Sequence, residues 1–98
     1  MNPVKKRIRY SDHLQYRLRF REINDRLPKM VYRSAKEHFL DIATNTRVAV
    51  AKVTYKGRLR DMAVTYREDA NEILLITIHP LKLNQKENRI QTNRWRKI

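Results

Sequence analysis

The sequence predicts a single α+β domain over residues 1–98, with two N-terminal helices packed on one face of a three- to five-stranded antiparallel sheet. Two observations predict this order. Apolar residues repeat at helical spacing until about residue 38, and they then alternate as in strands. The most apolar run, Ile73 to Ile78, is rich in β-branched residues and stops at His79-Pro80, as expected of a central buried strand.

Two helices are expected in the first part of the chain. Ser11 and Asp12 form a helix start, because serine accepts hydrogen bonds from the free N–H groups and aspartate suits the positive end of the dipole. This helix should run to about Glu22. Its apolar edges are formed by Leu14, Tyr16, Leu18, Phe20 and Ile23. A second helix should begin at Pro28 and end near residues 37–38.

The remaining residues have the alternation and turn chemistry of an antiparallel meander. Strands are expected at 38–42, 47–55, 58–66 and 73–79. Lys56-Gly57 is a two-residue hairpin turn. In the last strand, Ile73, Leu75, Thr77 and His79 are expected on one face. Residues 8–10 fit a strand or a helix start, 83–90 fit one or two helical turns, and 94–98 fit a short strand or a docked tail. Residues 1–7 are predicted to be a flexible basic arm.

The charge of the chain indicates its class of partner. There are 23 Lys and Arg residues against 10 Asp and Glu residues, a net charge of +13, with most of the excess in residues 1–37 and 79–98. Such a field favours a polyanion, so the expected partner is RNA, with DNA as an alternative. There is no cysteine, and the longest apolar run is too short to cross a bilayer. We therefore expect a cytoplasmic protein with no membrane partner and no cofactor.

A catalytic group is predicted where the most apolar strand ends. His79 follows this strand, and its imidazole can act as a general acid or base near neutral pH. Lys82 follows closely, and Arg58 and Arg60 can together hold a phosphate. The alternatives are a histidine that only ends a strand and arginines that only keep a sheet edge charged.

Further basic residues are candidates for nucleic-acid binding. His13, Arg17 and Arg21 repeat at intervals of four and form one stripe on a helix face. Near the C-terminus the candidates are Lys86, Arg89, Arg94 and Trp95, whose indole could stack on a base. The alternatives are an ordinary exposed helix face and a tryptophan that anchors the tail to the core. The three histidines are too scattered in sequence to predict a metal site.

Three segments resemble the RelE-like toxin (mRNA interferase) superfamily. They are S-D-H-L-x-x-R-L-x-x-R-x-I-x-x-x-L-P from residue 11, V-x-Y-K-G-R-x-R-D-M-x-V-x-Y from residue 53, and I-T-I-H-P-L-K-x-x-Q-K-E-N-R-I-x-x-x-R-W from residue 76. The resemblance implies two helices on an antiparallel sheet. It also implies a metal-independent endoribonuclease of a toxin–antitoxin system, in which the RNA 2′-OH attacks the adjacent phosphate.

Applied to this chain, the resemblance gives each candidate a role. Arg58 or Arg60 would neutralise the phosphate, His79 would be the acid or base, and Lys82 or Arg89 would add positive charge. Many such toxins have a functional tyrosine near the C-terminus, which this chain lacks, so Tyr66 is a candidate substitute. A small acidic antitoxin is the implied partner. The alternative function is a nucleic-acid-binding protein that does not cut.

Overall fold

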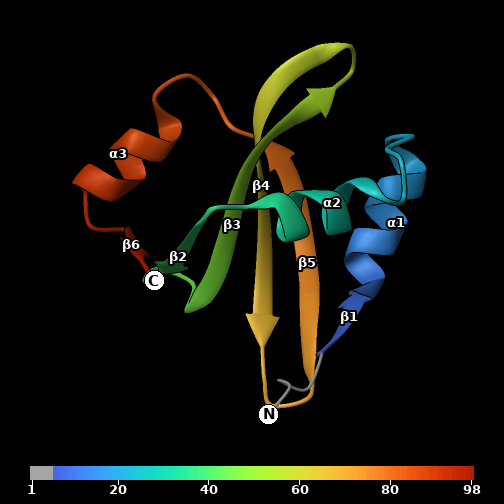
Figure 1. Ribbon diagram of the computed structural model, residues 1–98, viewed down its shortest axis with the longest axis horizontal. Helices are drawn as coiled ribbons and strands as arrows, with labels where there is room; N and C mark the ends of the chain where they lie inside the picture. Colours follow the sequence, from blue (N-terminus) through green and yellow to red (C-terminus); the bar gives the residue numbers. More distant parts are fainter. Residues whose placement is uncertain (1–5) are drawn as a thin grey trace.

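The computed structural model describes residues 6–98, in which three helices and a six-stranded mixed sheet form an α+β fold (Figure 1). The elements are β1 (Arg7–Tyr10), α1 (Asp12–Phe20), α2 (Leu27–Ser34), β2 (Glu37–Asp41), β3 (Thr46–Tyr55), β4 (Arg58–Glu68), β5 (Glu72–Pro80), α3 (Gln85–Gln91) and β6 (Trp95–Lys97). The strand order is β1-β5-β4-β3-β2-β6. The α+β class is as predicted, whereas a sheet of three to five strands, all antiparallel, is wrong.

The parallel pair is the pairing of β1 with β5. Residues 7–10 lie in register with residues 72–75, and the chain then turns into α1 at Ser11. Ser11 is the N-cap of α1, as predicted, since its Oγ accepts a hydrogen bond from the backbone N–H of Leu14 at 3.0 Å. Of the basic arm predicted over 1–7, the first five residues lie outside the described part of the chain. The prediction is wrong for Arg7, which begins β1.

The hairpin between β3 and β4 confirms the predicted two-residue turn. Lys56 and Gly57 have φ angles of 51° and 77°, both in the left-handed region. Positive φ at both central residues is the requirement of the turn that matches the twist of two antiparallel strands. Tyr55 and Arg58 flank the turn as the last pair of the ladder.

Both N-terminal helices are shorter than predicted. The first helix ends at Phe20 rather than at Glu22, whose φ of 54° is left-handed. The second ends at Ser34, and Ala35 is already extended, with φ −64° and ψ 127°. Residues 37 and 38 were predicted to end this helix but instead begin β2, where they pair with β3.

The sheet has an apolar core on each face. The larger core lies between the sheet and the two N-terminal helices, with α2 crossing the long strands and α1 beside β5 (Figure 1). We call this side of the sheet the helical face. The smaller core lies on the outer face and contains Phe39, Val48, Val50, Ala63, Leu81 and Trp95. Leu14 and Leu18 are buried as predicted, but the prediction that Tyr16 and Phe20 extend this apolar edge is wrong, because both are exposed.

A β-bulge in β5 changes the direction of His79. Tyr66 of β4 pairs with Leu75, but the neighbouring Thr65 pairs with Thr77, which leaves Ile76 as an extra residue. Beyond the bulge, alternation continues with Thr77 and His79 on the outer face. The prediction that these two residues share a face with Ile73 and Leu75 is therefore wrong.

The strand also continues one residue further than predicted. Pro80 pairs with Met62, and the N–H of Leu81 donates to the carbonyl of Asp61 at 2.9 Å. Alternation then turns the nitrogen of Pro80 away from β4. The nitrogen of Pro80 faces the edge of β5 that β1 does not cover. No strand pairs there, so the missing N–H of proline costs no ladder hydrogen bond.

Candidate functional site

A groove lies between α1 and the second half of β5. Because β1 covers only residues 72–75 and the carbonyl of Ile76 accepts from Ser11 Oγ, the edge of β5 from Thr77 onward is open to this groove. Its volume is about 410 Å³. We call it the α1–β5 groove, and its lining residues are His13, Leu14, Arg17, Arg21, Ile23, Ile76, Thr77, Ile78 and His79. Two imidazoles and two guanidinium groups thus line one groove, and none of its lining residues is acidic.

A second hollow lies on the outer face of the sheet and includes the same histidine. Its volume is about 330 Å³. It runs across β3, β4 and β5 towards α3 and β6. Its polar lining includes one acidic residue, Asp41, together with Thr65, Arg67, Thr77, His79, Arg89 and Arg94. His79 and Thr77 line both hollows, so the edge of β5 is the boundary that the two share. A polyanion that crossed this edge would meet cations on both sides.

His79 is half-buried, and its surroundings favour the neutral imidazole. Burial lowers the pKa of His79, because the charged form loses water, and the nearby guanidinium of Arg89 lowers it further. At neutral pH the ring is therefore a proton acceptor. This protonation state suits a general base and does not suit a permanent positive charge for holding phosphate.

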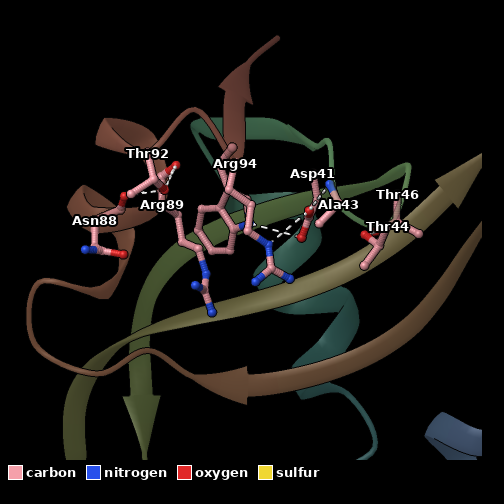
Figure 2. Close-up of polar contacts among 9 residues, drawn as sticks. Asp41, Ala43, Thr44, Thr46, Asn88, Arg89, Thr92 and Arg94 are labelled. Atoms are coloured by element: carbon pink, nitrogen blue, oxygen red, sulfur yellow. Dashed lines mark hydrogen bonds and ion pairs between the residues drawn. The ribbon is translucent and has the colours of Figure 1, made fainter.

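The C-terminal segment is fixed to the sheet through Asp41. Trp95 Nε1 donates to Oδ2 of Asp41 at 3.2 Å, and Arg94 Nε donates to Oδ1 at 3.3 Å (Figure 2). The backbone N–H of Ala43 also donates to Oδ1, at 3.0 Å. Burial alone raises the pKa of Asp41, but the hydrogen bonds from Arg94 and Trp95 outweigh it and hold that pKa below its usual value.

Two arginines lie beside this anchor. In Figure 2 the side chains of Arg89, on α3, and Arg94, just before β6, extend side by side over the sheet. The last turn of α3 is closed by the hydroxyl of Thr92, which donates to the carbonyl oxygen of Asn88 at 2.9 Å. Arg89 and Arg94 therefore reach the outer-face hollow from a segment whose end is held by Thr92 and by Asp41.

The structure does not bring the predicted catalytic set together. Arg60 has the same strand parity as Met62 and Val64, whose side chains are in the core of the helical face, whereas His79 lies opposite Ala63 on the outer face. Arg58 shares the parity of Arg60 and lies beside the hairpin turn. Lys82 is exposed beyond the end of β5 and lines neither hollow.

The predicted nucleic-acid-binding set divides in two. His13 and Arg17 lie along one side of α1, and Arg21 follows as its C-cap. All three line the α1–β5 groove with His79. Arg89 and Arg94 line the outer-face hollow. Lys86 lines neither, because its ammonium group is paired with Glu37 at 2.8 Å and ties α3 to β2.

The prediction that Trp95 stacks on a base is wrong, and the alternative of a tail anchor is right. Its side chain is only 4% exposed. The indole stacks on Phe39 with ring centroids 5.5 Å apart. The ring therefore belongs to the outer-face core and is not available to a ligand.

Tyr66 is equally unsuited to the role of a substitute catalytic tyrosine. It is 2% exposed in the helical-face core, and its hydroxyl is hydrogen-bonded to Nδ1 of His38 at 2.7 Å. Burial is the main reason that the pKa of Tyr66 rises to about 12, with neighbouring Tyr32 adding to it. Tyr66 does not line the groove or the hollow that His79 lines.

Sequence reasoning missed Thr65, Thr77 and Arg67 as lining residues. Thr65 and Thr77 form the ladder pair next to the bulge, and Thr77 directly follows the extra residue Ile76 in β5. Arg67 lies beyond the strand predicted over 58–66, but β4 continues to Glu68. Strand alternation could have predicted Arg67, because Ala63, Thr65 and Arg67 are two residues apart and therefore lie on the same face of β4. Alternation placed Thr77 on the same face as His79, but the face that the two residues share depends on the bulge.

Comparison of the chain with protein-family models, with curated proteins and with solved structures finds no match. Within residues 6–98, no helix has the length and apolar character needed to cross a membrane. The same residues contain no cluster of three or more His, Asp or Glu side chains arranged as metal ligands.

Proposed function

We propose that the protein is a metal-independent endoribonuclease of toxin type that cuts RNA in the α1–β5 groove. The observation that supports this most strongly is that two histidines and two arginines line one groove with no acidic side chain among them. Cleavage through the RNA 2′-OH needs a proton acceptor, a proton donor and positive charge near the phosphate. The resemblance to RelE-like toxins agrees with this chemistry but assigns the charge to different residues.

His79 is the general base in this proposal. Its neutral imidazole accepts the proton of the 2′-OH, and the 2′ oxygen attacks the adjacent phosphorus. The bond between phosphorus and the 5′ oxygen then breaks, and that oxygen takes a proton from the ring of His13. The products are a 2′,3′-cyclic phosphate and a free 5′-hydroxyl.

Arg17 and Arg21 hold the reacting phosphate. Their guanidinium groups line the groove with both histidines, and they can donate hydrogen bonds to the oxygens on which negative charge develops. Arg89 holds the RNA beyond the edge of β5, where it lines the outer-face hollow. Arg94 lines the same hollow, but its Nε is paired with Asp41, so only its other guanidinium nitrogens are left for phosphate. Arg58, Arg60 and Lys82 have no part in the reaction.

The test is incubation of single-stranded RNA in EDTA with purified protein and analysis of the product ends. Wild type is expected to leave 2′,3′-cyclic phosphates, and Arg17→Gln is expected to cut at least ~100-fold more slowly. Arg33→Gln is the matched control, because it removes an exposed arginine from α2, away from the groove. Absence of cleavage by wild type in EDTA, or products with 5′-phosphate and 3′-hydroxyl ends, would contradict the proposal.

A second candidate function is nucleic-acid binding without cleavage. It is favoured by the exposed position of His13, Arg17 and Arg21, which gives an open surface rather than an enclosed active site. Binding of this kind weakens steeply with salt, by a slope of about −0.7 per phosphate contact for a single strand. The affinity for DNA would equal the affinity for RNA, and neither would change in His79→Ala. An acidic protein partner such as an antitoxin would compete for the same cations.

A further inference from the structure

Two large aromatic side chains are exposed side by side on α1. Tyr16 is 61% exposed and Phe20 is 75% exposed. Their ring centroids are 6.1 Å apart, and the ring planes differ by only 14°, so the two faces are nearly parallel. A single exposed aromatic residue needs no explanation, but an aligned pair of exposed rings on one helix is an apolar surface that a ligand can contact.

The pair lies between positive charges. On a helix with 3.6 residues per turn, Tyr16 and Phe20 point directly away from the buried Leu14 and Leu18. His13, Arg17 and Arg21 lie on the side of the pair that faces the α1–β5 groove, and Arg19 lies on the other side. The rings therefore adjoin the cations that line the proposed site.

The rings and the cations around them favour one class of ligand over others. A second copy of this chain, with a net charge of +13, would bring like charges against Arg17 and Arg19. A single strand of nucleic acid brings phosphates to the cations and unpaired base faces to the rings. Successive residues of the stripe are separated by ~6 Å along the helix axis, a spacing that an extended strand can follow. A duplex keeps its bases stacked on one another and has no free faces to offer.

We propose that Tyr16 and Phe20 form a nucleobase-binding surface that makes the protein select single-stranded over double-stranded nucleic acid. This inference rests on the proposed function, since it requires that the α1–β5 groove holds a nucleic-acid backbone. The two rings determine specificity and do not take part in bond breakage. Stacking on an aromatic ring accepts any base, so the selection is for strandedness and not for sequence.

The test measures binding with 2′-O-methyl RNA, which has no 2′-OH to react, so the result does not depend on cleavage. Fluorescence anisotropy gives the affinity of each protein for a short single strand, for the same strand in a duplex and for a strand with abasic positions. Tyr16→Ala/Phe20→Ala is expected to bind the single strand about tenfold more weakly and the duplex unchanged. The dependence on salt should keep its slope, because no phosphate contact is lost.

Two further variants separate stacking from other effects. Tyr16→Leu/Phe20→Leu keeps an apolar surface without rings and should lose as much affinity as the alanine variant. Leu83→Ala, which removes a side chain that is 92% exposed, should bind as wild type does. For wild type, removing the bases of the strand should weaken binding about as much as removing the two rings of the protein does. Wild type and Tyr16→Ala/Phe20→Ala should therefore bind the abasic strand with equal affinity.

Several results would overturn the inference. One is that wild type and Tyr16→Ala/Phe20→Ala bind the single strand with equal affinity. Another is that wild type binds the duplex more tightly than the single strand. A third is that Tyr16→Leu/Phe20→Leu binds the single strand as tightly as wild type does. Self-association of wild type that is lost in the alanine variant would instead assign the pair to a protein interface. If wild type shows the predicted binding but does not cut RNA, the base-binding surface stands and only the proposed cleavage fails.

Discussion

The guanidinium of Arg89, on α3, acts on the imidazole of His79, at the end of β5, through charge. After burial, it is the second cause that lowers the pKa of His79. The two residues come from elements on different sides of the outer-face hollow, and both line it. The charge of Arg89 therefore links the C-terminal helix to the protonation state of the proposed base.

Removing this charge should raise the pKa of His79. In Arg89→Gln the repulsion of the imidazolium is absent but the burial remains, so the pKa should move up without returning to the ordinary value of 6.5. An NMR titration of the His79 ring protons measures the change. Lys82→Gln is the matched control and should leave the titration unchanged. An unchanged His79 titration in Arg89→Gln would show that burial alone sets the pKa.

The same group should make stability depend on pH. The folded-state pKa of His79 lies below its unfolded value of 6.5, so between these values the unfolded chain binds more protons than the folded one. The free energy of unfolding should therefore fall as the pH is lowered from 6.5 through the folded-state pKa. In His79→Gln this part of the dependence should be absent. Urea unfolding at a series of pH values compares the two proteins, and identical curves would contradict the assignment.

The Asp41 anchor should carry a measurable part of the stability. Asp41→Ala leaves the indole N–H of Trp95 buried without a partner, at a cost of about 1–3 kcal/mol in the free energy of unfolding. Denaturant unfolding followed by the fluorescence of the single tryptophan measures this cost. Asp61→Ala is the control, because Asp61 is paired with Lys52 only on the surface, at 3.8 Å, and should cost less than ~1 kcal/mol. If Asp41→Ala and Asp61→Ala lower the free energy of unfolding equally, the hydrogen bonds of Asp41 contribute no more than a surface ion pair.

A Tyr66 variant distinguishes the catalytic role that the resemblance implies for this tyrosine from the structural role that it has in the helical-face core. Tyr66→Phe removes the hydroxyl that bonds to His38 and should destabilise the protein by about 1 kcal/mol. It should leave RNA cleavage and its pH profile unchanged, because the hydroxyl lies in the helical-face core. Calorimetry and a cleavage assay below the melting temperature measure both. A large loss of cleavage in a folded variant would give Tyr66 a catalytic role.

Much of the fold could be predicted because local chemistry decides it. Ser11 followed by an apolar helical pattern fixed the start of α1, and Lys56-Gly57 between two alternating runs fixed the hairpin. The short, polar β1 was ambiguous, since four residues give little periodicity and their parallel partner lies more than sixty residues away. The end of α2 was overestimated because the pairing of residues 37 and 38 with β3 overrides their helix propensity.

The candidate site was harder to predict, because it depends on register. The run Ile73 to Ile78 is apolar throughout, so it contains no alternation that would reveal the extra residue at Ile76. The bulge turns His79 away from Arg58 and Arg60 and towards Arg89. The stripe on α1 could be predicted from spacing alone, but its approach to the open edge of β5 could not.

The most direct test of the central claim is a single-turnover rate measurement with RNA in EDTA for wild type, His79→Gln, His13→Gln and the double variant. Two histidines that act on one phosphate should each cost ~100-fold or more when replaced, and the double variant should be little slower than the slower single variant. His79→Gln that cuts as fast as wild type would contradict the account.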